Sequence, residues 1–155
     1  MRALTTMCAV FAMAVTAMAA DNTLGTWKYN TAKSKPAAGV SPIESLTVTR
    51  EATNGTVTIS AKGERKDGSK IDTVTTTKYD GAASSVTGTG LAWDSTTIKQ
   101  INANTLSEER SKQGGKYHST VRTVVSKDGK TMTGSTKGTD AEGKPFTSVA
   151  VFDKQ

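Results

Sequence analysis

The residue pairs that could carry catalysis are few, and strand geometry separates them. His118 is the single histidine, and Ser119 follows it directly. Neighbouring residues of an extended strand point to opposite faces, so these two side chains cannot form a base–nucleophile pair. Glu108 and Glu109 are divided between two faces for the same reason. We therefore expect no enzymatic activity.

Metal and cofactor chemistry finds no better support in the sequence. Asp140 and Glu142 lie at a turn, but the oxygen-ligand pattern of a calcium loop is absent around them. With Cys8 as the single cysteine and only one histidine, a disulfide scaffold, a cysteine-rich metal site and a multi-histidine zinc site are excluded. Asn54-Gly55-Thr56 matches a glycosylation acceptor, although a hairpin turn explains its Asn-Gly equally well. We expect no metal and no cofactor.

Residues 1–20 have the layout of a secretory signal. Arg2 supplies a positive charge, a short apolar run follows, and Ala17 and Ala19 form the small-residue pattern of a cleavage site. The apolar run falls short of the ~20 residues that a membrane-spanning helix needs. We expect export to the periplasm or the extracellular space, with residues 21–155 forming one domain.

The elements that must position any site are separated by turn signals. Asn-Gly and Asp-Gly adopt positive φ at little cost, as the tight turns of β-hairpins require. Such pairs, or Gly-rich equivalents, recur regularly along the chain: Asn54–Gly55, Asp67–Gly68, Asp80–Gly81, Gly114–Gly115, Asp128–Gly129 and Glu142–Gly143. The sequence therefore predicts a series of hairpins.

Between these turns the residues alternate with a period of two, which is typical of antiparallel strands with one wet face. Threonine, which is β-branched and suits a sheet, is abundant throughout. The predicted strands are Trp27–Asn30, Glu44–Thr53, Thr56–Lys62, Ser69–Tyr79, Ser84–Val86, Thr96–Asn102, Thr105–Lys112, Lys116–Ser126, Lys130–Gly138 and Pro145–Lys154. The long connection Lys33–Pro42 contains two prolines and a glycine, so we expect it to be irregular.

Consecutive hairpins without crossover helices predict an all-β fold, an antiparallel up-and-down meander. An open sheet of this size would leave two long edges, and closure into a barrel of eight to ten strands removes them. Most outward candidates are Thr, Lys, Ser and Asp rather than a continuous apolar belt. We therefore expect a soluble barrel without insertion into a membrane.

Two segments resemble a known superfamily. Gly25-Thr26-Trp27-Lys28 resembles the Gly-X-Trp signature that opens lipocalins and fatty-acid-binding proteins, the calycin barrels, and Trp93–Lys99 resembles a late strand of the latter. The resemblance implies a small exported lipocalin-like protein in which Trp27 plugs one barrel end beneath Arg122 or Lys154. The strand that carries the carboxylate clamp of fatty-acid-binding proteins holds Ala150-Val151-Phe152 here, so both polar partners of that clamp are missing.

A barrel of this size is either filled by side chains or wide enough for one small ligand. Its candidate interior includes bulky apolar side chains: Trp27, Leu46, Val48, Ile59, Ile71, Tyr79, Trp93, Ile98, Tyr117, Val121, Val125, Phe146 and Phe152. Thr73, Thr75, Thr77 and Thr123 share these faces, and their small polar side chains would leave room for a ligand.

The candidate ligand-binding residues follow from that interior. Tyr79, Trp93 and Tyr117 offer flat apolar walls with a polar edge. Arg50 shares a face with apolar neighbours, where a buried guanidinium would be costly unless it held an anion or a carboxylate. The alternative is that Arg50 lies at the end of its strand and reaches water. Arg122, and similarly Arg110, are further candidates. The face that Arg122 occupies stays open, because both faces of its strand carry aliphatic residues.

The formal net charge of +6 and a pI near 9.5 leave an anionic partner open. Because the lysines are scattered over turns and strands, we interpret them as solubilising and expect no nucleic-acid partner. The sequence thus predicts non-catalytic binding of a small apolar or amphipathic molecule. The alternative is a filled barrel that acts through its surface as an inhibitor or envelope-interaction protein.

Overall fold

The computed structural model describes residues 20–155, and this part of the chain consists of ten strands joined by turns and loops. The predicted signal, residues 1–20, lies almost wholly outside the described residues. The strands are β1 (Gly25–Tyr29), β2 (Ile43–Thr53), β3 (Thr56–Arg65), β4 (Lys70–Thr77), β5 (Asp80–Thr89), β6 (Ser95–Asn102), β7 (Thr105–Ser111), β8 (His118–Val125), β9 (Thr131–Thr139) and β10 (Pro145–Lys154). No helix within residues 20–155 could cross a membrane.

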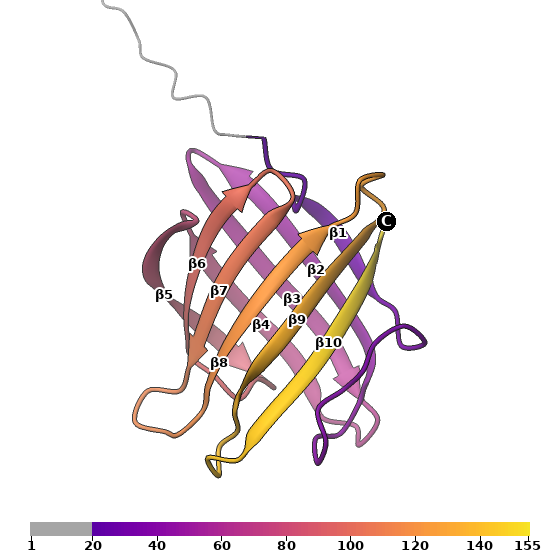
Figure 1. Cartoon of the computed structure of the whole chain (residues 1–155), viewed down its shortest axis with the longest axis vertical. Helices are drawn as coiled ribbons and strands as arrows, with labels where there is room; N and C mark the ends of the chain where they lie inside the picture. The colour runs from indigo at the N-terminus through magenta and orange to yellow at the C-terminus, as the bar shows by residue number, and fades with distance from the viewer. Residues whose placement is uncertain (1–19) are drawn as a thin grey trace, which may run out of the picture.

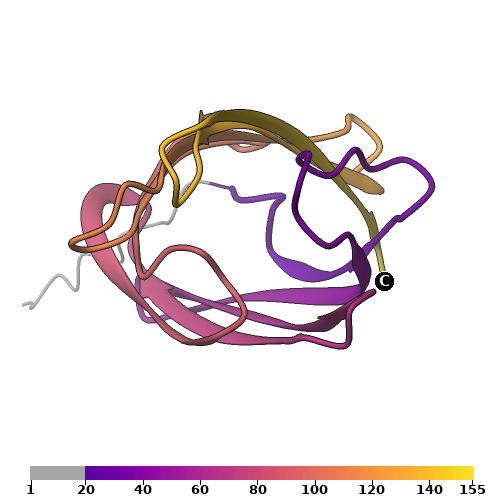
Figure 2. The ribbon, with the colours of Figure 1, turned by 90° about the horizontal axis from the view of Figure 1, so that it is seen from below.

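The strands form one closed antiparallel barrel. Each pairs with the next along the chain, and β1 returns to pair with β10, where Trp27 lies opposite Lys154 and Tyr29 opposite Phe152 (Figures 1 and 2). Closure leaves no strand edge unpaired, which explains why the meander curls round rather than remaining an open sheet. The predicted all-β, up-and-down barrel is confirmed.

Most turns lie where the sequence predicts them, and one is displaced. At Asn54–Gly55 both residues have positive φ, 49° and 78°, as a two-residue hairpin turn requires. The turn predicted at Asp80–Gly81 comes slightly earlier, because β5 already begins at Asp80 and Tyr79 takes a φ of 58°. Tyr79 is buried and hydrogen-bonded through its hydroxyl, so tertiary contacts hold a backbone conformation that tyrosine rarely adopts.

Trp27 lies buried in a core cluster near one end of the barrel. Its indole is fully buried, Nε1 donates a hydrogen bond to the Thr23 carbonyl oxygen at 2.8 Å, and the Lys154 amine lies 4.9 Å from the ring centroid. Leu46, Val48, Ile71, Val125 and Met132 belong to the same buried cluster. The start of β1, the C-terminus and the short β2–β3 turn lie at this end, the upper one in Figure 1.

The opposite end is formed by longer connections. The segment from residue 30 to residue 42 is irregular, as predicted, and is held by two backbone hydrogen bonds between Lys35 and Val149, of 2.7 and 2.8 Å. The loops that follow β3, β5, β7 and β9 lie at the same end, and Figure 2 looks into it. Loop residues, among them Trp93 between β5 and β6, therefore surround this opening.

Candidate functional site

The barrel interior contains a cavity of about 1200 Å³ that opens at the loop end. It extends from Arg50 and Thr75 inside the barrel to residues 35–41 and 140–144 around the opening. Its apolar wall comes from inward-facing residues of many strands: Leu46, Val48, Ile59, Ile71, Ile98, Val121, Met132 and Phe152. The volume is at or above the ~300–1,000 Å³ of typical small-molecule sites.

Small side chains explain why the interior is not filled. Thr73, Thr75 and Thr123 are buried and line the cavity, as the alternation predicted for their faces. Ala61 and Gly134 add two further small residues to the same wall. A larger aliphatic residue at these positions would occupy space that the threonines leave open, and each hydroxyl adds a polar group to an otherwise apolar wall.

Arg50 and Tyr79, both predicted ligand-contact residues, meet within this interior. Arg50 follows Leu46 and Val48 on the inward face of β2 and is only 7% exposed. Its Nη1 donates a hydrogen bond of 2.9 Å to the Tyr79 hydroxyl. Its Nε is buried without a hydrogen-bond partner in the described part of the chain. The barrel thus buries a guanidinium whose donors are only partly used.

Glu108 and Arg110 form an ion pair on the inward face of β7. Arg110 donates from Nε to Oε1 and from Nη2 to Oε2 of Glu108, at 2.8 and 2.9 Å, and Thr96 Oγ1 donates to Oε1 at 2.8 Å. Burial alone would raise the pKa of the Glu108 carboxyl, but the charges of Arg110 and Arg50 and these hydrogen bonds outweigh it and lower the pKa. Glu108 is therefore ionised at neutral pH.

The remaining predicted aromatics lie together in the cavity wall. Trp93 and Tyr117 stack with centroids 5.6 Å apart and planes 20° apart, and Tyr117 lies 5.9 Å from Phe146. The Arg110 guanidinium lies 4.3 Å from the Trp93 centroid on the cavity side of β7. Because these rings already cover one another, they supply a rigid wall rather than a free stacking surface.

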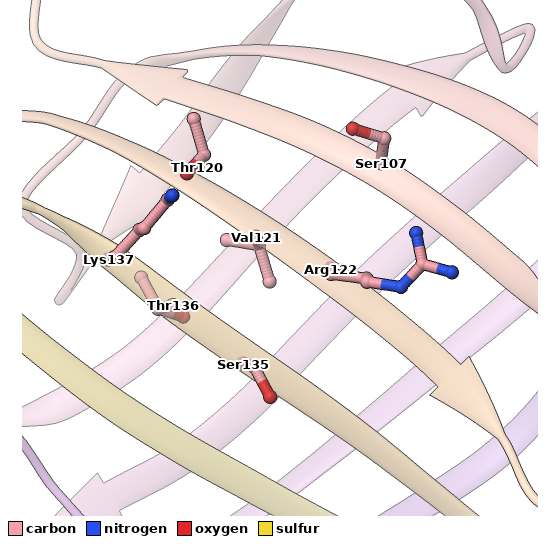
Figure 3. A pocket seen from close by; sticks show the side chains of 7 residues that line it. All are labelled: Ser107, Thr120, Val121, Arg122, Ser135, Thr136 and Lys137. Carbon is pink, nitrogen blue, oxygen red and sulfur yellow. The ribbon is translucent and has the colours of Figure 1, made fainter.

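Arg122 does not join these residues. On β8 Val121 and Thr123 are buried and line the cavity, so Arg122 between them points outward and is exposed. It borders a separate outer hollow of about 410 Å³ with Lys137 of the neighbouring strand β9 (Figure 3). The face of β8 that the sequence left open is thereby assigned, and Arg122 lies outside the interior cavity.

Sequence reasoning missed Glu108 as an interior residue. It separated Glu108 from Glu109 correctly, since Glu108 is buried and Glu109 exposed, but assigned no role to either. The sequence did contain a signal. Leu106, Glu108 and Arg110 are spaced by two residues, so an acidic and a basic side chain share one strand face with a leucine. On a strand such spacing places a carboxylate and a guanidinium side by side on one face.

The arrangement of His118 gives no nucleophilic site. His118 is exposed, whereas Ser119 is fully buried and its Oγ lies 3.1 Å from the Tyr117 hydroxyl. Within residues 20–155, no group of three or more His, Cys, Asp or Glu side chains is placed to hold a metal ion. The interior offers a ligand an apolar wall and a few polar groups.

Comparison with known proteins assigns no family. No family model and no curated protein matches the chain. A solved structure described as EF1p2_mFAP2b bound to DFHBI is similar with a TM-score of 0.48 and 11% sequence identity, over 86% of this chain and 94% of that one. So distant a likeness carries neither ligand nor function to this chain, and the site is interpreted from its own geometry.

Proposed function

We propose that this chain is an exported, lipocalin-like binding protein that holds one small amphipathic molecule inside its barrel and performs no reaction on it. The observation that carries the proposal is the open cavity of about 1200 Å³, with its apolar wall and few polar groups. Sites for small molecules share this character, since burial of apolar surface supplies affinity and a few polar groups fix orientation. Export rests on the signal pattern of residues 1–20.

The cavity counts against the alternative of a filled barrel that acts through its surface. A filled barrel would have inward side chains packed as closely as a protein interior, with few voids larger than a water molecule. In this barrel the inward-facing threonines that line the cavity are too small to fill it.

A neutral fluorescent amphiphile, phenylnaphthylamine, tests the proposal by titration. We expect saturable binding of one dye per chain. Replacing the inward Thr123→Trp fills part of the cavity and should weaken binding by about tenfold or more, a loss of ~1.4 kcal/mol or greater. The matched control is Val124→Trp, the next residue on β8, which points outward and is 39% exposed.

Circular dichroism of both variants checks that the barrel is intact. The control variant should bind dye as the unmodified protein does. Dye binding that never saturates, or that is equally strong in the Thr123→Trp protein, would contradict binding in the interior.

A further inference from the structure

Arg50 presents an unused edge of its guanidinium group. Tyr79 occupies Nη1, Nε is buried and unpartnered, and no hydrogen bond in the described part of the chain uses Nη2. Nε and Nη2 form the edge with which arginine binds a carboxylate side-on through two parallel hydrogen bonds. Arg110 uses these same two atoms on Glu108 within the same barrel. The unused edge of Arg50, a residue that lines the cavity, therefore has the donor pattern that binds an oxyanion.

In the part of the chain that the structure describes, Arg50 also has no carboxylate to form an ion pair with, because the buried Glu108 is paired with Arg110. Glu108 is the one acidic residue among those described that is less than a tenth exposed, and both of its oxygens accept hydrogen bonds from Arg110. None of the ion pairs within residues 20–155 involves Arg50. The charge of Arg50 acts on Glu108, but no ion pair joins the two residues. A buried cation without an ion-pair partner is costly, and an anion that enters the cavity would reduce that cost.

We infer that the molecule held in the barrel is an amphiphile with an oxyanion headgroup, a carboxylate or sulfonate, which the Nε–Nη2 edge of Arg50 binds. This inference rests on the proposed function and names the chemical class of its ligand. The apolar part of the ligand lies along the cavity wall, which includes Leu46, Val48 and Ile59 close to Arg50 in sequence or strand pairing. Tyr79 holds the guanidinium in place and is a positioning residue.

Two dyes that differ in one group provide the test. Anilinonaphthalene sulfonate carries a sulfonate on the phenylnaphthylamine skeleton, so the pair isolates the contribution of the anion. We expect the purified protein to bind the sulfonate at least about tenfold more tightly, as a charge-assisted hydrogen-bonded pair would allow. Equal affinity for both dyes would overturn the inference and leave the proposed function standing, whereas saturable binding of neither dye would overturn both.

The variant Arg50→Met removes the charge and keeps a buried chain of similar length. It should lose the preference for the sulfonate, so that the affinities for the two dyes lie within about twofold of each other. Retained binding of the neutral dye shows that the variant is folded. The control Arg122→Met alters an exposed arginine outside the cavity and should change neither affinity. A sulfonate preference that survives Arg50→Met would overturn the inference.

Competition with sodium sulfate separates an amphiphile from an inorganic anion. Potassium chloride at equal ionic strength corrects for screening of the charge. We expect sulfate to displace the sulfonate dye no better than chloride does, because sulfate lacks an apolar part for the wall. Specific displacement by millimolar sulfate would show that Arg50 serves inorganic anions and would overturn the assignment to an amphiphile.

Discussion

The buried pair of Glu108 and Arg110 illustrates how single residues control this interior. Arg110 is less than a quarter exposed and Glu108 less than a tenth, so neither charge is well solvated. Breaking such a pair leaves one uncompensated buried charge, whereas replacing both partners with apolar residues removes the problem. Removing one member of the pair should therefore destabilise the fold more than replacing both members with apolar residues.

This asymmetry gives a prediction for two variants. Glu108→Leu should lower the free energy of unfolding by about 3–5 kcal/mol at neutral pH, because Arg110 is left buried without its carboxylate. The double variant Glu108→Leu with Arg110→Leu should lower the free energy of unfolding clearly less, because it leaves no unpaired buried charge. Urea denaturation measures both, and a double variant as unstable as the single one would contradict this account of the pair.

Acid titration of the same proteins supplies the control. The folded-state pKa of Glu108 lies below its ordinary value of 4.5, so ionised Glu108 stabilises the fold above that value. The contribution is lost as the pH falls through the lowered pKa. The stability difference between the unmodified protein and Glu108→Leu should therefore shrink in strong acid. A difference that stays constant from neutral pH to strong acid would mean that the carboxylate charge is not involved.

The sequence could predict some of these residues and not others. Arg50 was predictable, because its strand has a clear apolar face that begins with Leu46 and Val48. The orientation of Arg122 was not, because Val124 shares its face while Val121 and Val125 occupy the other. Only the closed barrel decides between them, by placing one face of every strand around the same axis.

At the scale of the strands, glycines set how closely neighbouring backbones approach. A Cβ at Gly63 of β3 would lie 2.1 Å from the Ser45 carbonyl oxygen and 2.7 Å from the Leu46 Cα on β2. The β2–β3 register shifts at the same place, between Ile43 and Ser45. A glycine at an irregular point of a strand commonly permits such a close approach. The close approach of the β2 and β3 backbones at Gly63 therefore depends on the missing side chain.

Two alanine variants test this role. Gly63→Ala should lower the free energy of unfolding by about 1–3 kcal/mol, as overpacking does, because backbone atoms of β2 must move. The control is Gly134→Ala on β9, where the nearest atom to an added Cβ, Val121 Cγ1, is 3.7 Å away. Thermal unfolding compares them, and an equal effect at both positions would contradict the close-approach argument.

Most elements were predictable because their cues are local. Alternation and Asn-Gly or Asp-Gly turns located all ten strands, although the predicted Ser84–Val86 is the longer strand Asp80–Thr89. The turn near Tyr79 was misplaced because its cause is tertiary: the burial of the ring and its hydrogen bond with Arg50. Local sequence could not predict the positive φ of Tyr79, because Arg50 on the distant strand β2 holds that residue in place.

At the scale of the whole molecule, closure and the cavity have different origins. Closure of the barrel was predictable because an open sheet would leave two unpaired edge strands. The pairing of β1 with β10 removes those edges. The cavity was only suggested by inward threonines, because its volume depends on strand number, stagger and the distances across the barrel. Those quantities arise from all strands together and could not be read from any one segment.

Native mass spectrometry of the purified protein tests most directly whether the barrel binds one small molecule. We predict a one-to-one complex with a small molecule, either carried through purification or formed on adding the neutral dye, and release of that molecule on extraction with organic solvent. The Thr123→Trp variant should show a clearly smaller fraction of this complex under the same conditions. A bare chain mass for the unmodified protein with the dye in excess would contradict the account.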